Sequence, residues 1–303
     1  MKIHVGPVSD PKLEQAVLDG GGELAPAAEA SAAVYFGAGP DRFDEVDHPG
    51  LEWVQLPAAG VEPWLNAGAL RDGVTFTSAA GCYADAVAEH ALALMLAGAR
   101  KLHTEARADS WARPEGIGSV FGSTVGIIGA GGIGKALIRL LEPFGVRVLA
   151  VNRSGKPVEG AARTSPAQDV DAIRSLLSTS DFVVVAAPAT SSTSQLIDDE
   201  ALSLMQPHAW LVNVARGSLV DTDALLRALA EERIGGSALD VTDPEPLPDG
   251  HPLFREPRAL VSPHCANPLD LLVPALAQRV QENVRRRIAG QPLLAVVDPA
   301  AGY

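Results

Sequence analysis

Three glycines in the segment GIIGAGGIGKAL (126–137) have the spacing of a loop that binds the phosphates of a nucleotide. In a G-x-G-x-x-G loop, Gly129 permits the tight turn, Gly131 lets the backbone approach a pyrophosphate, and Gly134 lets the helix pack on the strand. The loop follows an apolar strand pattern and opens a helical one, so the phosphates would meet N–H groups at the positive helix end. The segment therefore predicts a dinucleotide site.

A second phosphate loop, G-x-x-x-x-G-K-[ST], fits the same letters except at one position. Its last residue must supply a hydroxyl to Mg²⁺, and this chain has Ala136 there. Lys135 is equally well explained as a solvated helix residue. A protein that hydrolyses nucleoside triphosphates is kept as an alternative, which Mg²⁺-dependent ATP binding would revive.

The residues after the second expected strand, 146–151, indicate which dinucleotide binds. An NAD site usually has Asp or Glu about 20 residues past the first glycine, where the acid meets the adenosine ribose. This chain has Asn152, Arg153 and Ser154 there, and no carboxylate. An acid would repel a 2′-phosphate, whereas Arg153 would attract one. The turn favours NADP(H), with NAD(H) also possible.

A cation, a carboxylate and an imidazole follow three later apolar segments. Arg216 follows LVNVA, Glu245 lies in DPEP just beyond GSALDV, and His264 ends ALVSPH. Ligands of a doubly wound sheet bind outside the carboxyl ends of its strands, so these side chains should share the cofactor's edge. His208 precedes its strand and should lie at the other edge. Each residue alone has an ordinary structural explanation, but together they favour a site.

These three residue types fit the reduction of a 2-keto acid. Arg216 can bind the substrate's carboxylate or carbonyl oxygen and stabilise the charge that develops there. An imidazole, with an ordinary pKa of about 6.5, is suited to give the carbonyl oxygen a proton near neutral pH. A carboxylate at the other ring nitrogen, the role expected for Glu245, fixes the tautomer and favours the protonated form. His90 and His103, in a long helical pattern, are interpreted as packing or surface histidines.

Two runs of alternating strand and helix patterns would position these residues. From residue 124 onward, six strand patterns with helical connections predict a doubly wound Rossmann sheet. Four shorter strand patterns in the first 80 residues predict a second, smaller α/β domain with a parallel sheet. The expected strands are 124–129, 146–151, 181–188, 209–215, 236–241 and 258–264 in the first case, and 3–8, 32–37, 51–56 and 74–79 in the second.

Two long helical patterns could connect the domains. The first, 84–108, bridges from the smaller domain, and the second, 271–290, could return to it. We expect residues 1–98 and 286–303 to form the substrate domain and residues 99–285 the dinucleotide-binding domain. Two crossings of this kind would make a hinged cleft. A Gly- and Pro-punctuated arm at 110–123 suggests a homodimer.

Charge and composition exclude several classes of partner. The 303-residue chain has a net charge of −13, which opposes binding to nucleic acid or to an anionic membrane but leaves small anionic ligands possible. Its most apolar stretch is too short to span a bilayer and contains Glu89 and His90. The two cysteines, Cys82 and Cys265, have no zinc-ligand spacing, so no metal site is expected. The N-terminus lacks a signal-peptide layout, so we expect a cytoplasmic protein.

The motifs NVARGSLVD, ALDVTDPEPLP, HPLF and SPH resemble those of the D-isomer-specific 2-hydroxyacid dehydrogenases. The segment VAEHALALMLAGAR is similar to the interdomain helix of that family. The resemblance covers nearly the whole chain, with the motifs in the family's order. It implies the family's reduction chemistry for Arg216, Glu245 and His264, and a flavodoxin-like substrate domain beside the Rossmann domain.

The resemblance also implies further contacts. The N–H groups of the turn Ala58, Ala59 and Gly60 would bind the substrate carboxylate, and Asp240 would hold the nicotinamide carboxamide. After His264 this chain reads CANPLD, where many relatives have a Gly- or Ala-rich turn followed by Ser or Thr. The full set expected to bind the cofactor is Gly129, Gly131, Gly132, Ile133, Gly134, Asn152, Arg153, Ser154, Pro188, Ala215 and Asp240.

Two functions follow from these patterns. The first is an NADP(H)-preferring reductase of a small 2-keto acid such as glyoxylate or hydroxypyruvate, giving a D-2-hydroxy acid, because the short N-terminal domain and the NRSGK turn look most like glyoxylate/hydroxypyruvate reductases. The second is a dinucleotide-sensing binding protein, since the family includes transcriptional corepressors that can keep the catalytic residues. Turnover with a panel of keto acids separates the two.

Overall fold

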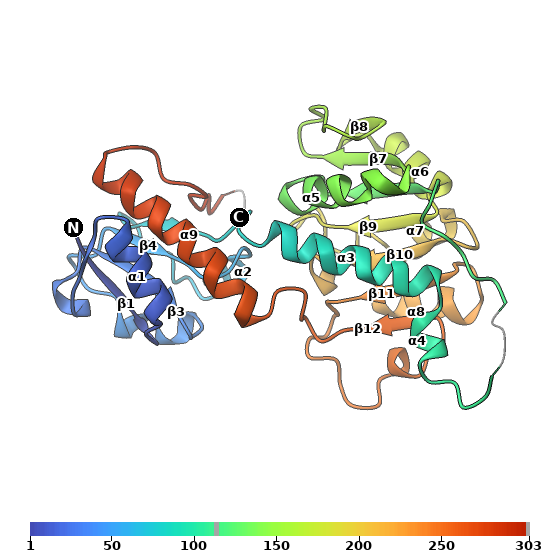
Figure 1. Ribbon diagram of the computed structural model, residues 1–303, viewed down its shortest axis with the longest axis horizontal. Coiled ribbons are helices and arrows are strands. Elements are labelled where there is room, and N and C mark those ends of the chain that lie inside the picture. The colour runs from blue at the N-terminus through green and yellow to red at the C-terminus, as the bar shows by residue number, and fades with distance from the viewer. Residues whose placement is uncertain (112–114, 301–303) are drawn as a thin grey trace. The chain divides into compact units, whose positions relative to one another are not determined.

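The computed structural model describes residues 1–111 and 115–300, and its chain divides into two compact units (Figure 1). The first unit is Met1–Tyr83 with Asn267–Tyr303, and the second is Ala84–Ala266. The chain therefore passes between the units twice. No helix among the described residues is long and apolar enough to cross a membrane.

The first unit contains a five-stranded parallel sheet in the order β2-β1-β3-β4-β5. This order is the flavodoxin-like 2-1-3-4-5 arrangement, which confirms the fold expected for the smaller domain. Four strands match the sequence patterns, and β2 is an addition of two exposed residues at the sheet edge. The strands are β1 (Lys2–Pro7), β2 (Glu23–Leu24), β3 (Ala32–Phe36), β4 (Trp53–Gln55) and β5 (Thr75–Thr77).

Helices pack on this sheet, and a side-chain hydrogen bond marks the start of the first one. The helix α1 (Pro11–Asp19) begins where Asp10 Oδ1 accepts a hydrogen bond from the Lys12 N–H at 2.8 Å. It buries three apolar residues and packs on α9 (Leu269–Ile288). The short helix α2 (Glu62–Asn66) buries Trp64. Short 3₁₀ turns lie at Ala27–Glu29 and Pro40–Glu45.

The second unit contains a seven-stranded parallel sheet in the order β12-β11-β10-β9-β6-β7-β8. Counted from β6, this is the Rossmann order with one further strand. Successive strands are added on one side of β6 up to β8 and on its other side from β9 onward, so the topological switch point lies between β6 and β9. The strands are β6 (Thr124–Ile128), β7 (Arg147–Asn152), β8 (Arg163–Pro166), β9 (Phe182–Val185), β10 (Trp210–Asn213), β11 (Gly236–Leu239) and β12 (Ala259–Val261). The edge strand β8 was not predicted, because only Ser165 of its four residues is buried.

The helices of the second unit are α3 (Ala84–Ala99), α4 (Leu102–Glu105), α5 (Gly132–Leu141), α6 (Val170–Thr179), α7 (Asp199–Leu204) and α8 (Thr222–Ala230). Further 3₁₀ turns lie at Glu142–Phe144, Gly217–Leu219 and Pro252–Phe254. The continuous helix expected over 84–108 is wrong, because the chain leaves α3 after Ala99 and Lys101 has a left-handed φ of 53°. The arm expected at 110–123 has no helix or strand among its described residues, and 112–114 lie outside them.

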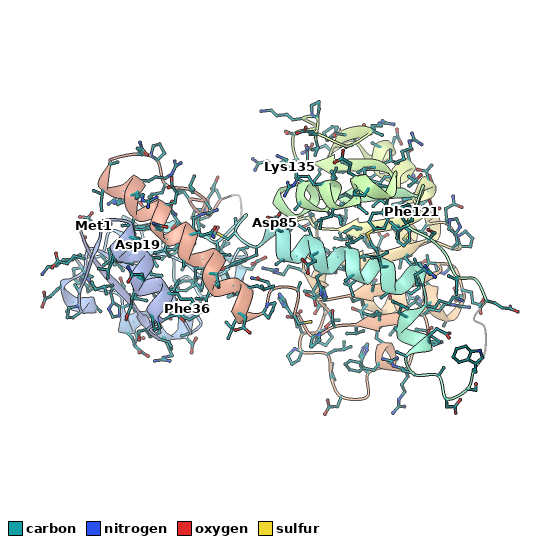
Figure 2. The ribbon with its side chains drawn as sticks, viewed as in Figure 1. Met1, Asp19, Phe36, Asp85, Phe121 and Lys135 are labelled. Atoms are coloured by element: carbon teal, nitrogen blue, oxygen red, sulfur yellow. The ribbon has the colours of Figure 1, made fainter. Side chains whose placement is uncertain are left out.

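The two long helices belong to different units from those expected. The helix α3 packs on α5, β10 and β11. Asp85 lies in its first turn (Figure 2), and its Oδ1 atom is 2.8 Å from a guanidinium nitrogen of Arg139 in α5. The helix α3 therefore belongs with the second unit from its first residue, whereas the sequence placed the boundary at 98/99. The helix α9 packs on α1 and belongs with the first unit, although 285/286 was the expected boundary.

Candidate active site

The glycine loop joins β6 to α5 with little space around its backbone. Gly129 has φ of 100°, and a Cβ there would lie 2.3 Å from the Ala187 N atom beyond β9. A Cβ at Gly134 would lie 3.0 Å from the Gly129 carbonyl oxygen, so this glycine allows the helix to approach the strand. A Cβ at Gly131 would meet no atom within 4 Å. Packing thus explains two of the glycines, and the third leaves open space beside exposed backbone.

The first turn of α5 offers backbone donors beside that space. The Lys135 N–H bonds to the Gly131 carbonyl oxygen at 3.0 Å. Within the described residues, no hydrogen bond uses the N–H groups ahead of it, those of Gly132, Ile133 and Gly134. Such groups at a helix N-terminus suit phosphate oxygens. Ala136, where a triphosphate loop needs its hydroxyl, is 2% exposed and packs in the core.

The turn after β7 is organised by the Asn152 side chain. Its Oδ1 atom accepts hydrogen bonds from the backbone N–H groups of Gly155 at 2.7 Å and Ser154 at 3.1 Å. Its amide donates to the Lys156 carbonyl oxygen at 2.9 Å. Asn152 therefore holds the shape of the turn that presents Arg153, Ser154 and Lys156, all three with exposed or partly exposed side chains.

The remaining candidates of this unit follow strand ends at one edge of its sheet. Because all seven strands are parallel, their carboxyl ends lie along the same edge. Pro188 follows β9, Ala215 and Arg216 follow β10, Asp240 follows β11 and His264 follows β12. His208 precedes β10, at the opposite edge, where its Nε2 lies 2.6 Å from Asp181 Oδ1.

His264 and Glu245 form a close pair at this edge. The His264 Nδ1 atom lies 2.6 Å from Glu245 Oε1, and both side chains are partly exposed. The other oxygen of Glu245 accepts a hydrogen bond from the Thr242 N–H at 3.3 Å, which ties the carboxylate to its own loop. The Nδ1 atom of the imidazole is thus engaged, and Nε2 is the nitrogen available to a substrate.

The backbone next to Arg216 is tightly packed. The following Gly217 packs so tightly that a Cβ would lie 1.9 Å from the Thr242 carbonyl oxygen, so the β10 exit and the loop carrying Glu245 touch. Asn213 fixes this exit, donating to the Arg216 carbonyl oxygen at 2.9 Å and accepting from the Ala215 N–H at 3.0 Å. The Arg216 guanidinium donates from Nη1 to the Ala215 carbonyl oxygen at 2.7 Å.

Asp240 is a buried charged residue, with 2% of its surface exposed. Its Oδ1 atom accepts from Ser262 Oγ at 2.7 Å and the Cys265 N–H at 3.0 Å, and its Oδ2 atom from the Ala266 N–H at 3.1 Å. His90 Nε2 of α3 lies 3.2 Å from Oδ1. Burial alone would raise the pKa of the Asp240 carboxyl, but these hydrogen bonds outweigh burial and hold it well below its usual range.

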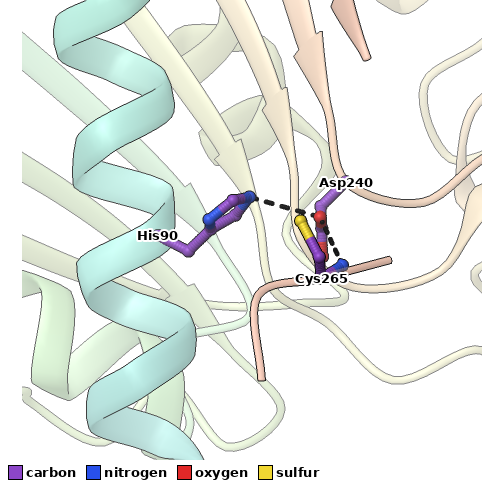
Figure 3. Close-up of side chains that lie close together, drawn as sticks. All are labelled: His90, Asp240 and Cys265. Atoms are coloured by element: carbon purple, nitrogen blue, oxygen red, sulfur yellow. Dashed lines mark hydrogen bonds and ion pairs between the residues drawn. The ribbon is translucent and has the colours of Figure 1, made fainter. Parts of the chain in front are cut away.

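His90, Asp240 and Cys265 place one potential metal ligand atom each within 4.8 Å of one another (Figure 3). A metal ion there would have to displace hydrogen bonds that already occupy both oxygens of Asp240. Burial, and then the charge of Asp240, raise the pKa of the Cys265 thiol, which disfavours the thiolate that binds metals. We therefore interpret the cluster as a hydrogen-bond network.

The turn Ala58-Ala59-Gly60 lies in the first unit, just beyond β4. The Ala58 carbonyl oxygen accepts from the Ala79 N–H at 2.9 Å. Across the described ranges, no hydrogen bond uses the N–H groups of the three turn residues, and Ala58 and Ala59 are exposed. These three donors suit a carboxylate.

Sequence reasoning missed His90, which it interpreted as a packing or surface residue. The ring nitrogen Nε2 also lies 3.1 Å from Ser262 Oγ, so His90 contacts both partners of the Asp240 network. The helical spacing could have placed His90 on the packed face of α3, because it lies three residues after Val87 and four before Leu94, which are both buried. The polar partner on the facing strand end could not be found from that spacing.

The fold of the second unit is that of a dinucleotide-binding domain, whose ligands bind at the carboxyl ends of the strands. Residues 91–266, more than half of the chain, match the NAD binding domain of the D-isomer specific 2-hydroxyacid dehydrogenases. The chain belongs to this family of NAD(P)-dependent enzymes.

Three relatives illustrate the match. The chain is 37% identical over 228 residues to a glyoxylate reductase of Thermococcus gammatolerans, covering 71% of this chain and 67% of the relative. A D-isomer specific 2-hydroxyacid dehydrogenase from Xanthobacter autotrophicus Py2, crystallised with NADPH and MES, has a TM-score of 0.84 and 29% identity over 100% of this chain and 99% of that one. An NADPH-dependent glyoxylate/hydroxypyruvate reductase from Sinorhizobium meliloti, in complex with NADP and sulfate, has a TM-score of 0.80 and 26% identity with the same coverage.

Proposed function

We propose that this dehydrogenase is an NADP(H)-preferring reductase of small 2-keto acids of the glyoxylate and hydroxypyruvate class, with a D-2-hydroxy acid as product. The observation that carries the proposal is the 2.6 Å pairing of His264 with Glu245 at the carboxyl edge that also bears Arg216. The relatives named as glyoxylate or glyoxylate/hydroxypyruvate reductases support the choice of substrate class.

The residues of the carboxyl edge have separate tasks in this reaction. When bound, the reduced dinucleotide supplies the hydride. Arg216 binds the carboxylate or the carbonyl oxygen of the keto acid and stabilises the negative charge that develops on the carbonyl oxygen. His264 gives a proton from Nε2 to the same oxygen, while Glu245 holds the ring through Nδ1. The N–H groups of Ala58, Ala59 and Gly60 are donors for the substrate carboxylate.

The chain's own residues also fit the cofactor. We assign the pyrophosphate to the open N–H groups of Gly132, Ile133 and Gly134, beside the space at Gly131. Pro188 and Ala215 line the same edge. The role expected for Asp240, a contact with the nicotinamide carboxamide, stays a prediction. Its carboxylate already accepts three hydrogen bonds and lies 3.2 Å from His90 Nε2.

The preference for NADP(H) rests on the turn after β7. Arg153 follows Asn152 at the strand end, and Ser154 and Lys156 are held beside it. A guanidinium and a hydroxyl suit a 2′-phosphate, and no carboxylate is present to repel it or to bind a ribose hydroxyl. NAD(H) remains usable in this proposal, at lower efficiency.

The competing function is that of a dinucleotide-sensing binding protein of the same fold. Turnover distinguishes them: the purified chain is incubated with NADPH and a panel of 2-keto acids, and NADPH loss and hydroxy-acid formation are both measured. Equal amounts of NADP⁺ and D-hydroxy acid are expected. Tight NADPH binding without turnover of any keto acid would instead support the binding protein.

We further propose that the enzyme works in the cytoplasm as a homodimer. Both cysteines are free thiols, as in a reducing compartment. The arm at 110–123, part of which lies outside the described residues, is the segment proposed to contact the second copy, and sedimentation of the wild type and of a variant lacking the arm tests it.

A further inference from the structure

Three consecutive backbone N–H groups donate to one residue, Asp240. The His264 N–H bonds to its carbonyl oxygen at 2.8 Å, the Cys265 N–H to Oδ1 at 3.0 Å and the Ala266 N–H to Oδ2 at 3.1 Å. His264 itself has a left-handed φ of 49°. A left-handed residue followed by inward-pointing N–H groups forms a concavity that binds an anion, and here the anion is the Asp240 carboxylate.

This arrangement links the conformation of His264 to the carboxylate. A left-handed conformation costs a residue with a side chain about 1–2 kcal/mol, so it persists only where surrounding contacts stabilise it. The bonds from residues 264–266 to Asp240 are such contacts. The orientation of the carboxylate therefore fixes the turn on which the His264 ring approaches Glu245.

His90 and Ser262 also contact that carboxylate, and Figure 3 shows the His90 ring reaching from α3 toward Asp240. The Ser262 hydroxyl donates to Oδ1 at 2.7 Å, and His90 Nε2 lies 3.1 Å from the hydroxyl and 3.2 Å from Oδ1. His90 comes from a different element, α3, which begins at the first passage of the chain between the units. Ala266 is the last residue before the second passage. The network thus joins α3 to the turn that ends the second unit.

We propose that His90 is a positioning residue for the reduction: by donating from Nε2 to the Ser262–Asp240 pair, it orients the carboxylate that holds the His264 turn. The inference rests on the proposed function for its catalytic consequence. Removing the donor leaves the buried carboxylate with one bond fewer, so it can rotate away from the N–H groups of Cys265 and Ala266. The His264 ring then loses its fixed position relative to the substrate.

The first test compares His90→Leu with His90→Gln, whose amide can donate in place of the ring. In His90→Leu we expect kcat to fall about tenfold or more, since small misplacements of a catalytic group cost up to 10²-fold, with the keto-acid KM and the NADPH Kd within about twofold of wild type. His90→Gln should recover most of the rate. His208→Leu removes the matched pair with Asp181 at the opposite sheet edge and should leave kcat unchanged.

A second readout needs no turnover. In a Cys82→Ser background, the remaining thiol is Cys265, which lies in the turn and is exposed. If the turn loosens, this thiol gains water and moves from the Asp240 charge, so its reaction with Ellman's reagent should become several-fold faster in His90→Leu, but not in His90→Gln or His208→Leu.

The outcomes separate the two proposals. Unchanged thiol reactivity in His90→Leu, or a kcat that Gln fails to recover, would overturn the positioning role. If the wild type shows no turnover, the proposed function fails, whereas the thiol measurement still decides whether His90 holds the turn.

Discussion

The Nδ1 atom of His264 lies 2.6 Å from Oε1 of Glu245, although the residues come from the exits of two different strands. Glu245 is itself held through its second oxygen by the Thr242 N–H at 3.3 Å. The pair thus holds the imidazole through Nδ1 and leaves Nε2 as the nitrogen that can meet the substrate.

The variant Glu245→Gln removes the negative charge of the Glu245 side chain while keeping its size and hydrogen-bonding capacity. The amide can keep a hydrogen bond to Nδ1 but lacks the negative charge of the carboxylate, so we expect kcat to fall roughly 10²-fold, the lower end of the usual contribution of general acid–base catalysis. The KM for the keto acid should change little. Steady-state kinetics with NADPH check both values, and a kcat within about twofold of wild type would show that the carboxylate does not assist the proton transfer.

Arg216→Ala should raise the keto-acid KM and lower kcat together, because its contact with the substrate exists before and during hydride transfer. Loss of a hydrogen bond to a charged group is worth about 1.5–3 kcal/mol, or roughly 10- to 100-fold in kcat/KM. The control is Arg227→Ala, on the exposed side of α8, which should alter neither value. An unchanged KM in the Arg216 variant would mean that the turn at 58–60 holds the carboxylate alone.

Cofactor preference depends on the turn after β7. A charge-assisted bond from Arg153 to the 2′-phosphate, worth about 1.5–3 kcal/mol, predicts a kcat/KM roughly 10- to 100-fold higher with NADPH than with NADH. In the double variant Asn152→Asp, Arg153→Ala the preference should reverse. An aspartate can still accept from the N–H groups of Ser154 and Gly155, so the turn keeps its shape and gains the charge that repels a phosphate.

Arg147→Ala provides the matched control, because this exposed arginine begins the same strand at its opposite end. It should leave the ratio of the two kcat/KM values unchanged. A wild type that uses NADH as efficiently as NADPH would contradict the role given to Arg153.

Asp240 should make stability depend on pH in the acid range. Its pKa is lower in the folded protein than in the unfolded chain, so its contribution to the free energy of unfolding is present above the ordinary pKa of about 3.9 and is lost as the pH falls below it. Asp240→Asn should therefore be less stable than wild type at pH 7, by about 1.5–3 kcal/mol, with the difference shrinking below about pH 4.

Urea unfolding at pH 7 and near pH 3 measures this difference. The exposed Asp249→Asn serves as the control and should be indistinguishable from wild type at both pH values. A constant deficit for Asp240→Asn at both pH values would show that the residue contributes by packing alone.

The sheet of the second unit could be predicted well from the sequence because its buried parallel strands are continuous apolar runs, as in FVVV of β9 and WLVN of β10. The rule that ligands bind at carboxyl ends then placed Arg216 and His264 at one edge without any coordinates. The edge strand β8 could not be predicted, because its sequence RTSP has one buried residue and no apolar pattern.

Details set by contacts distant in sequence could not be predicted. The contact of His90 with Asp240 joins residues 150 positions apart, which helical spacing within α3 cannot reveal. Motifs therefore indicated which strand ends matter, while the hydrogen bonds that hold them required the structure.

The most direct test of the proposed mechanism is a comparison of His264→Ala with wild type in NADPH-dependent reduction of glyoxylate and hydroxypyruvate, with NADPH binding measured in parallel. Wild type should turn over both substrates, and the variant should lose roughly 10²- to 10⁴-fold in kcat, the contribution of general acid catalysis, while its NADPH Kd stays within about twofold. Turnover by His264→Ala at the wild-type rate would remove His264 from the reaction and contradict the account.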